Sequence, residues 1–295
     1  MDVLRTPDAR FEGLEGYDFE PNYVEVDGLR LHYVDVGPRD TDPVLFLHGE
    51  PTWAYLYRDM LRVVADAGFR AVAPDFAGFG RSDKPADPEA YTYQLHIDRT
   101  RAAIEKIGLG NVTLFGQDWG GLVGLRLVAE DGDRYARCVI GNSYLPTGDP
   151  PPPEIWFAFR DVVRKAPELD VGRLVDAGCV KTLSDAERAG YDAPFPDESY
   201  KIGVRRFPDL VPASTEDPES GNNEAAWKAL EAWSKPFLTL FGDSDPIFAR
   251  SDLVLQKRIP GASGQPHQTI AKAGHFLQED AGEQVARAIV DWLRA

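Results

Sequence analysis

Apolar runs separated by turn residues divide this chain into predicted strands and helices. Short continuous apolar runs rich in β-branched residues are typical of strands that are buried on both faces of a parallel sheet. Longer amphipathic runs, such as 93–107 and 279–293, predict helices between them. The predicted strands lie at 23–26, 31–36, 44–47, 71–73, 112–115, 137–141, 237–241 and 268–271.

The order of these elements predicts the fold class. The first two strands are joined at Asp27-Gly28, which is a hairpin signal, so we expect an antiparallel edge. Beyond them, strands alternate with helices, which favours a parallel sheet with right-handed crossovers. The sequence therefore predicts an α/β protein with a mostly parallel, doubly wound sheet.

This alternation stops between residues 145 and 223. The stretch has no apolar strand run and instead contains a proline run, a polar stretch at 214–223 and predicted helical segments at 154–163, 174–183 and 184–189. We expect an inserted helical subdomain. The core would then comprise residues 1–144 and 224–295, with the insertion at 145–223.

Composition and charge exclude several classes of function. The chain has 295 residues and is 43% hydrophobic, enough for one large core with an inserted subdomain. The 32 basic and 48 acidic residues give a net charge of −16, which argues against a nucleic-acid or anionic-membrane partner.

No cofactor or metal motif is present in the sequence. Cys138 and Cys179 are too few and too far apart for a disulfide framework or a zinc site. The Gly78-Phe79-Gly80 segment is not a dinucleotide fingerprint, because no helix opens on it. The chain also has neither an apolar leader nor a run of membrane-spanning length, so we expect a cytoplasmic protein without cofactor or metal.

The segment at 111–121, NVTLFGQDWGG, is the most informative stretch of the chain. It predicts a strand, a sharp turn and a helix, and its tip has the glycine spacing of the nucleophile elbow G-x-S-x-G with Asp118 in place of serine. A carboxylate is already ionised and could attack carbon directly, forming an ester. The alternative is an aspartate that only caps the helix.

Two further strand ends carry polar residues that match Asp118. Ligands of open parallel sheets bind at the carboxyl ends of the strands, and Asp118, Asp245 and His275 each follow a strand. Their order along the chain is that of the α/β-hydrolase triad. Asp243 is a rival for Asp245, which we prefer because Pro246 and the apolar residues after it fit a loop that turns back across a pocket.

Seven motifs are distributed along nearly the whole chain. They are HGEPTW at 48–53, DFAGFGRSDKP at 75–85, GQDWGG at 116–121, DAPFPDESY at 192–200, VRRFPDLV at 204–211, GDSDP at 242–246 and AGHFLQED at 273–280. Together they resemble the motifs of the haloalkane dehalogenases, and within that family those of the subfamily with Glu after His-Gly. The paired HGEP and QDWGG motifs are highly specific.

The resemblance implies an α/β-hydrolase core with a helical cap and a two-step hydrolysis. Asp118 would displace halide from a small halogenated aliphatic substrate, and His275, held by Asp245, would activate water against the resulting ester. The backbone N–H groups of Glu50 and Trp119 would form the oxyanion hole. Water would be the second substrate, and alcohol and halide the products.

The resemblance also implies a halide site and an apolar pocket. The indole N–H of Trp119 would hold the departing halide. The second donor would be a tryptophan on the first cap helix, for which Trp156 is the candidate, although the family's register falls nearer Phe159. Other residues expected to line the pocket are Phe207, Pro208, Val211, Ile247 and Phe248.

Two other functions remain open at the level of sequence. Epoxide hydrolases share the fold, the aspartate nucleophile and the HG-x-P loop, and need cap tyrosines, for which Tyr144, Tyr191 and Tyr200 are candidates. A hydrolase fold kept as a binding module is disfavoured because every triad position is filled.

Overall fold

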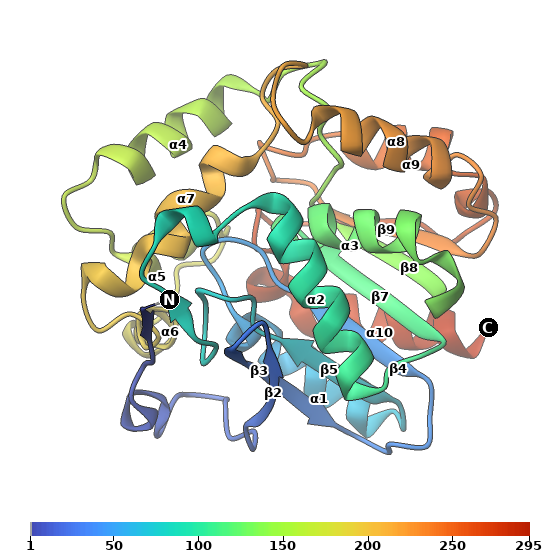
Figure 1. Cartoon of the computed structure of the whole chain (residues 1–295). Coiled ribbons are helices and arrows are strands. Elements are labelled where there is room, and N and C mark those ends of the chain that lie inside the picture. Colours follow the sequence, from blue (N-terminus) through green and yellow to red (C-terminus); the bar gives the residue numbers. More distant parts are fainter. Residues whose placement is uncertain (1) are drawn as a thin grey trace.

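An eight-stranded sheet forms the centre of the computed structural model, which describes residues 2–295 (Figure 1). The strand order is β10-β9-β8-β7-β4-β5-β3-β2, with parallel pairing from β10 to β5 and antiparallel pairing at β3 and β2. The mostly parallel sheet and its antiparallel edge are therefore confirmed. The strands are β2 (Asn22–Val26), β3 (Leu29–Val36), β4 (Pro43–Leu47), β5 (Arg70–Pro74), β7 (Val112–Gln117), β8 (Tyr135–Gly141), β9 (Phe237–Gly242) and β10 (Gln268–Ile270).

Helices cover both faces of this sheet, which explains why every residue of β4 and β7 is buried (Figure 1). One face carries α1 (Arg58–Asp66) packed on α10 (Leu277–Arg294). The other carries α2 (Tyr93–Ile107), α3 (Trp119–Glu130) and α8 (Ser220–Leu230), where α3 packs against both neighbours. The core also contains α9 (Ser251–Arg258) and a small antiparallel pair, β1 (Val3–Leu4) with β6 (Lys84–Pro85).

Helix α2 has the predicted bounds because both ends are capped. The Thr92 side chain accepts a hydrogen bond from the Leu95 N–H at 3.1 Å, and Gly108 ends the helix with φ +77°. Helix α1 was not predicted, although its buried Met60, Leu61 and Val64 have helical spacing.

Four helices lie between β8 and α8, beside the carboxyl ends of the strands (Figure 1). They are α4 (Glu154–Lys165), α5 (Val171–Ala177), α6 (Asp185–Asp192) and α7 (Ile202–Leu210). The predicted helix at 174–183 is wrong beyond Ala177, where the chain turns into a loop. Helix α7 was missed because Pro208 lies inside it.

Helix α8 begins at Ser220, so its first turn lies in the polar stretch at 214–223 that the sequence analysis assigned to the insertion. The polar side chains of this turn reach across to the segment after β8: Asn223 donates to the Pro146 carbonyl at 2.7 Å and Ser220 to the Thr147 carbonyl. Because these side chains have hydrogen-bond partners, their burial leaves no donor unsatisfied. Residues 145–219, which lie between β8 and α8, are referred to below as the insertion.

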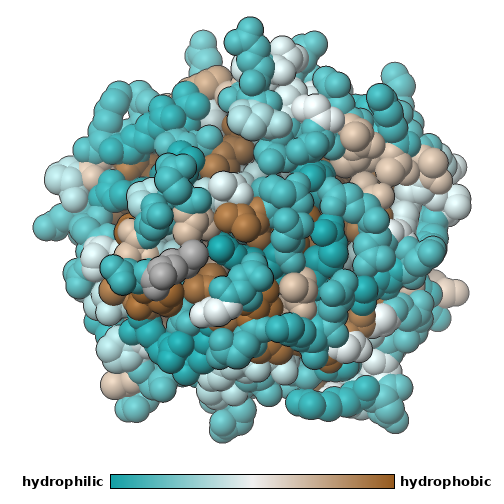
Figure 2. Space-filling view, viewed as in Figure 1, coloured by the Kyte–Doolittle hydropathy of each residue, from teal (hydrophilic) through white to brown (hydrophobic). Residues whose placement is uncertain are grey.

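Hydrophilic side chains cover most of the face shown in Figure 2, in line with the charged composition. Large apolar residues that stay exposed include Ile155, Val180 and Val254. No helix within residues 2–295 is long and apolar enough to cross a membrane.

Candidate active site

Asp118 lies at a strained turn between β7 and α3. Its φ of +50° and ψ of −127° fall in a region that residues with a side chain rarely adopt. The turn is possible because Gly120 packs directly on the Leu47 carbonyl, where a Cβ atom would collide. The carboxylate lies beside the loop after β4, and the Glu50 backbone N–H donates to its Oδ1 atom at 2.7 Å.

The backbone of Asp118 is also fixed from the neighbouring strand. Its N–H donates to the Asn142 carbonyl at 3.1 Å, and the Ser143 hydroxyl donates to its carbonyl at 2.7 Å. Both partners follow β8, which lies next to β7 in the sheet. The position of the carboxylate is therefore determined by the core.

His275 brings the other two predicted residues together. Its Nδ1 atom lies 3.2 Å from Asp245 Oδ2, and its Nε2 atom lies 3.6 Å from Asp118 Oδ2. Asp245 is buried, and its Oδ1 atom accepts the Ile247 N–H at 2.8 Å. The rival Asp243 is exposed and pairs with the Ser244 hydroxyl. Asp245, not Asp243, is thus the carboxylate beside the imidazole.

The two carboxylates control the charge of the imidazole. Burial by itself lowers the pKa of His275, but the neighbouring Asp245 and Asp118 outweigh it and raise that pKa to about 10. Burial would likewise raise the pKa of Asp245, yet the charge of His275 and the hydrogen bond from Ile247 lower it below its ordinary value. The two acids therefore favour the imidazolium form of His275.

Two polar side chains of the core bind the backbone around His275. Gln117 donates to the His275 carbonyl at 3.0 Å. Asn142, with a φ of +37°, donates to the Gly274 and His275 carbonyls at 2.7 and 3.0 Å and accepts the Gly242 N–H at 2.8 Å. The sequence analysis missed Asn142. Its place directly after a core strand is the one local signal that it has.

The Glu50 side chain is a buried acid that the sequence did not explain. Its Oε1 atom has no hydrogen-bond partner among residues 2–295. Burial, together with the nearby charge of Asp118, raises the pKa of Glu50 well above its ordinary value. A raised pKa favours the neutral form of this carboxyl group, which limits the negative charge in the site.

A largely apolar cavity of about 800 Å³ opens above these groups. Pro208, Val211, Ile247 and Phe248 line it, as does His275, on whose ring Phe248 stacks at 5.9 Å. The insertion supplies wall residues that the sequence analysis did not select, namely the proline run at 150–153 and residues 177–180. A proline run is stiff, so it makes a fixed wall.

Trp119 lines the cavity next to Asp118, but Phe207 does not. The Phe207 ring is buried behind the indole, 4.6 Å from it and 4.6 Å from the Phe79 ring. The expectation that Phe207 lines the pocket is therefore wrong. Helix α7 turns Pro208 toward the cavity and Phe207 toward the core. The Trp119 indole N–H has no hydrogen-bond partner within the described chain and remains available to a ligand.

Trp156 and Phe159, both on α4, line the same cavity. Trp156 is 7% exposed, its ring lies 4.9 Å from the Arg160 guanidinium, and its indole N–H also lacks a partner within residues 2–295. Two tryptophan side chains whose indole N–H groups make no hydrogen bond within residues 2–295 thus line one cavity. Phe159 is half-buried and offers only a ring edge.

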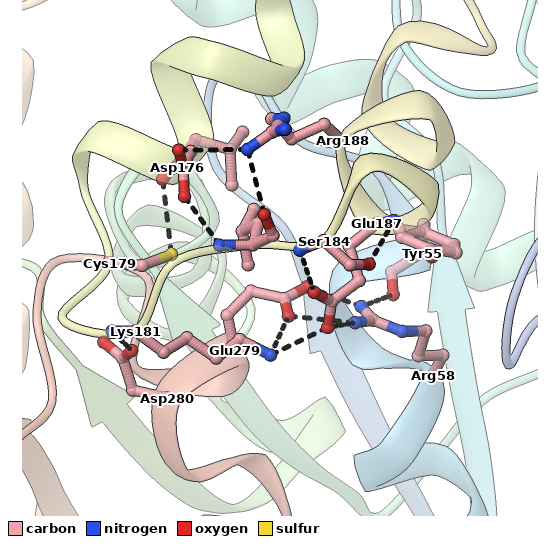
Figure 3. Close-up of polar contacts among 12 residues, drawn as sticks. Tyr55, Arg58, Asp176, Cys179, Lys181, Ser184, Glu187, Arg188, Glu279 and Asp280 are labelled. Atoms are coloured by element: carbon pink, nitrogen blue, oxygen red, sulfur yellow. Dashed lines mark hydrogen bonds and ion pairs between the residues drawn. The ribbon is translucent and has the colours of Figure 1, made fainter.

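The tyrosines expected of an epoxide hydrolase are not gathered at the cavity. Tyr144 lines it, whereas neither Tyr191 nor Tyr200 does. Tyr191 is fully buried and its hydroxyl donates to Glu279. Glu279 also binds Arg58 through two hydrogen bonds of 2.5 and 2.9 Å, in the network of Figure 3.

Among residues 2–295 there is no group of three or more His, Cys, Asp or Glu side chains that could hold a metal ion.

Comparison with known proteins gives consistent results for the sequence and the structure. Residues 42–282 match the family described as alpha/beta hydrolase fold. The chain is 53% identical to a haloalkane dehalogenase of Psychrobacter cryohalolentis, covering 99% of this chain and 98% of that one, and 52% identical to one of Mycobacterium marinum, covering 99% and 100%. The structure resembles that of the haloalkane dehalogenase DpaA from Paraglaciecola agarilytica, with a TM-score of 0.90, 36% identity and 97% of each chain covered.

Proposed function

This chain belongs to the haloalkane dehalogenases of the α/β-hydrolase family, and from that premise we propose that Asp118, His275 and Asp245 carry out its hydrolytic dehalogenation. The substrate is a halogenated alkane, which water converts to an alcohol and a halide ion. The insertion at residues 145–219 acts as the cap that closes the apolar cavity. The roles of the individual residues follow from their positions.

In the first step Asp118 is the nucleophile. Its Oδ1 atom accepts the Glu50 N–H, which leaves Oδ2 to attack the halogen-bearing carbon. The carbon–halogen bond breaks as the carbon–oxygen bond forms, so the electron pair leaves with the halide and Asp118 becomes a neutral alkyl ester. The indole N–H groups of Trp119 and Trp156 bind the halide as its charge develops in a site with little water.

In the second step His275 is the base. The imidazolium lies between two carboxylates, and ester formation removes the charge of one of them, Asp118. The pKa of His275 then falls from about 10, and the ring can release its proton and accept one from water. Asp245 orients the ring through its Nδ1 atom.

The hydroxide attacks the ester carbonyl, whose oxygen is the former Oδ1 atom. The backbone N–H of Glu50, with that of Trp119, stabilises the negative charge on this oxygen. Collapse of the intermediate breaks the bond to the alkoxide, which takes the proton from His275 and leaves as the alcohol. Asp118 is then a carboxylic acid, and its proton passes to the neutral imidazole, which restores the carboxylate and the imidazolium.

One observation carries this proposal: an aspartate takes the place of serine at the elbow, lies beside a His–Asp pair, and lines a largely apolar cavity together with two tryptophans. Serine would need a base for the first step, whereas the carboxylate does not.

The test is incubation with 1-bromobutane and, separately, with styrene oxide. We expect equal amounts of bromide and butanol from the first and no diol from the second. Diol without bromide would support an epoxide hydrolase, and neither product would support a binding module; either result would overturn the proposal.

A further inference from the structure

A loop of the insertion and the loop that carries His275 lie against each other. We refer to residues 178–181, which follow α5, as the insertion loop, and to residues 274–276 as the histidine loop. The His275 N–H donates to the Gly178 carbonyl at 2.8 Å. A Cβ atom at Gly274 would lie 2.5 Å from that carbonyl oxygen, and one at Gly178 would lie 2.7 Å from the Phe276 ring. The two loops therefore lie closer together than residues with a Cβ atom at positions 178 and 274 would allow.

Asp280, in the first turn of α10, joins these two loops through a single carboxylate. Its Oδ1 atom accepts the Lys181 N–H at 2.8 Å, and its Oδ2 atom accepts the Gly274 N–H at 2.8 Å. The Val180 N–H lies between them, 3.0 and 2.9 Å from the two oxygens. Figure 3 shows Asp280 beside Lys181 and Cys179. An ionised carboxylate makes stronger hydrogen bonds to backbone N–H groups than a neutral acceptor does.

The neighbouring Glu279 also holds the insertion loop, through the side chain of Lys181. The Lys181 ammonium lies 3.0 Å from Glu279 and 2.9 Å from Glu187, and Glu279 in turn binds the buried Arg58 of α1 (Figure 3). Lys181 is thus held at its backbone by Asp280 and at its side chain by Glu279. The insertion loop is fixed to the core at the point where it meets the histidine loop.

Asp118 does not depend on these contacts. Its carboxylate is held by Glu50 and its backbone by Asn142 and Ser143. Hydrogen bonds hold the histidine loop on two sides. On the core side they come from Asn142 and Gln117. On the insertion side they go to Gly178 and Asp280. Loss of Asp280 would therefore loosen His275 while leaving the nucleophile in place.

We propose that Asp280 is a positioning residue for His275, which acts by holding the histidine loop against the insertion loop, and that it serves ester hydrolysis but not ester formation. This inference rests on the proposed function, in which His275 acts as base only in the second step. Small displacements of a catalytic base reduce its rate steeply, but the remaining contacts of the core limit the loss.

The experiment compares Asp280→Asn with the parent in rapid-mixing assays with 1-bromobutane. Asparagine keeps the shape, but in either orientation its NH₂ group faces a backbone N–H. We expect one equivalent of bromide at a rate within about twofold of the parent, followed by turnover about tenfold slower, with alkylated protein visible by intact mass. Asp291→Asn, on the exposed side of the same helix, is the matched control and should behave like the parent.

Equal losses in both steps, or turnover of Asp280→Asn within twofold of the parent, would overturn the proposal, since the first indicates a general structural role and the second no role. If Asp280→Asn does not fold, Asp280→Glu, which shifts the carboxylate by one methylene, is judged by the same criterion. Failure of the parent to release bromide would instead refute the proposed function.

Discussion

The two sides of the cavity are held in place by different kinds of interaction. On the strand side, Asp118, Asp245 and His275 follow β7, β9 and β10, whose order and register are set by sheet hydrogen bonds. On the insertion side, Trp156 and Phe159 project from α4, which packs on α7 through side chains. The reacting groups are therefore fixed by backbone geometry, and the wall that meets the substrate is fixed by packing.

This difference assigns a separate task to each side. Hydrogen bonds between backbone groups have narrow geometry, which suits groups that must meet a reacting atom. Packed side chains can be exchanged at small cost if volume is kept. Changes on the strand side should then abolish one chemical step, and changes on the insertion side should alter substrate and halide preference by smaller factors.

The largest effect is expected for Asp118→Ala. Without the carboxylate no ester can form, so bromide release should fall by about 10⁴-fold or more. Bromide assays with 1-bromobutane measure this. Asp243→Ala is the matched control, because Asp243 follows the same strand end as Asp245 but is exposed, and it should keep parental activity. Residual turnover of Asp118→Ala near the parental rate would place the chemistry elsewhere.

His275→Phe should leave the first chemical step intact and block the second. The first step needs no base, so we expect one equivalent of bromide, after which turnover slows by about 10³-fold because the ester persists. Intact-mass analysis should show the alkyl group on Asp118. A variant that releases bromide without any adduct, or forms no bromide at all, would contradict the assignment of His275 to the second step.

The raised pKa of His275 should make the stability of the fold depend on pH. The folded pKa of His275, about 10, lies above its ordinary value of 6.5, so this group stabilises the fold below pH 6.5 and loses that contribution as pH rises through 10. Asp118→Asn removes one cause of the shift. The melting temperature of the parent minus that of the variant should therefore fall between pH 7 and 10, by about 3 °C or more.

The comparison with a variant is needed because Lys84 titrates in the opposite sense. Burial lowers the pKa of Lys84 to about 7, so its contribution to stability rises with pH over the same interval. Lys84 is common to both proteins, and its effect cancels in the difference. A difference that stays constant from pH 7 to 10 would show that Asp118 does not raise the pKa of His275.

The smallest effect is expected on the insertion side. Trp156→Phe removes one indole N–H, and a single hydrogen bond contributes about 0.5–1.5 kcal/mol, or about two- to tenfold. Turnover of 1-chlorobutane should fall more than that of 1-bromobutane, since chloride is the poorer leaving group, and halide binding should weaken. If Trp156→Phe matches the parent while Phe159→Trp improves both properties, Trp156 is not the donor.

The sequence by itself determined the sheet, most of the helices that cover it and the residues at the strand ends. The apolar runs of β7 and β9 are continuous because both faces of the sheet are buried there. Asp118 directly follows β7, and Asp245 and His275 lie in the loops after β9 and β10. Parallel strands end at one edge, so the meeting of these residues could be predicted from their local context alone.

The tertiary structure alone decided which side chains face the cavity and which hold the loops. Phe207 and Pro208 are adjacent on α7, and only the packing of that helix turns one to the core and the other to the pocket. Asn142 and Asp280 bind backbone groups up to 133 residues away. Local periodicity shows which face of an element is apolar. A hydrogen bond between distant loops depends instead on how the elements pack, so such a bond leaves no local pattern in the sequence.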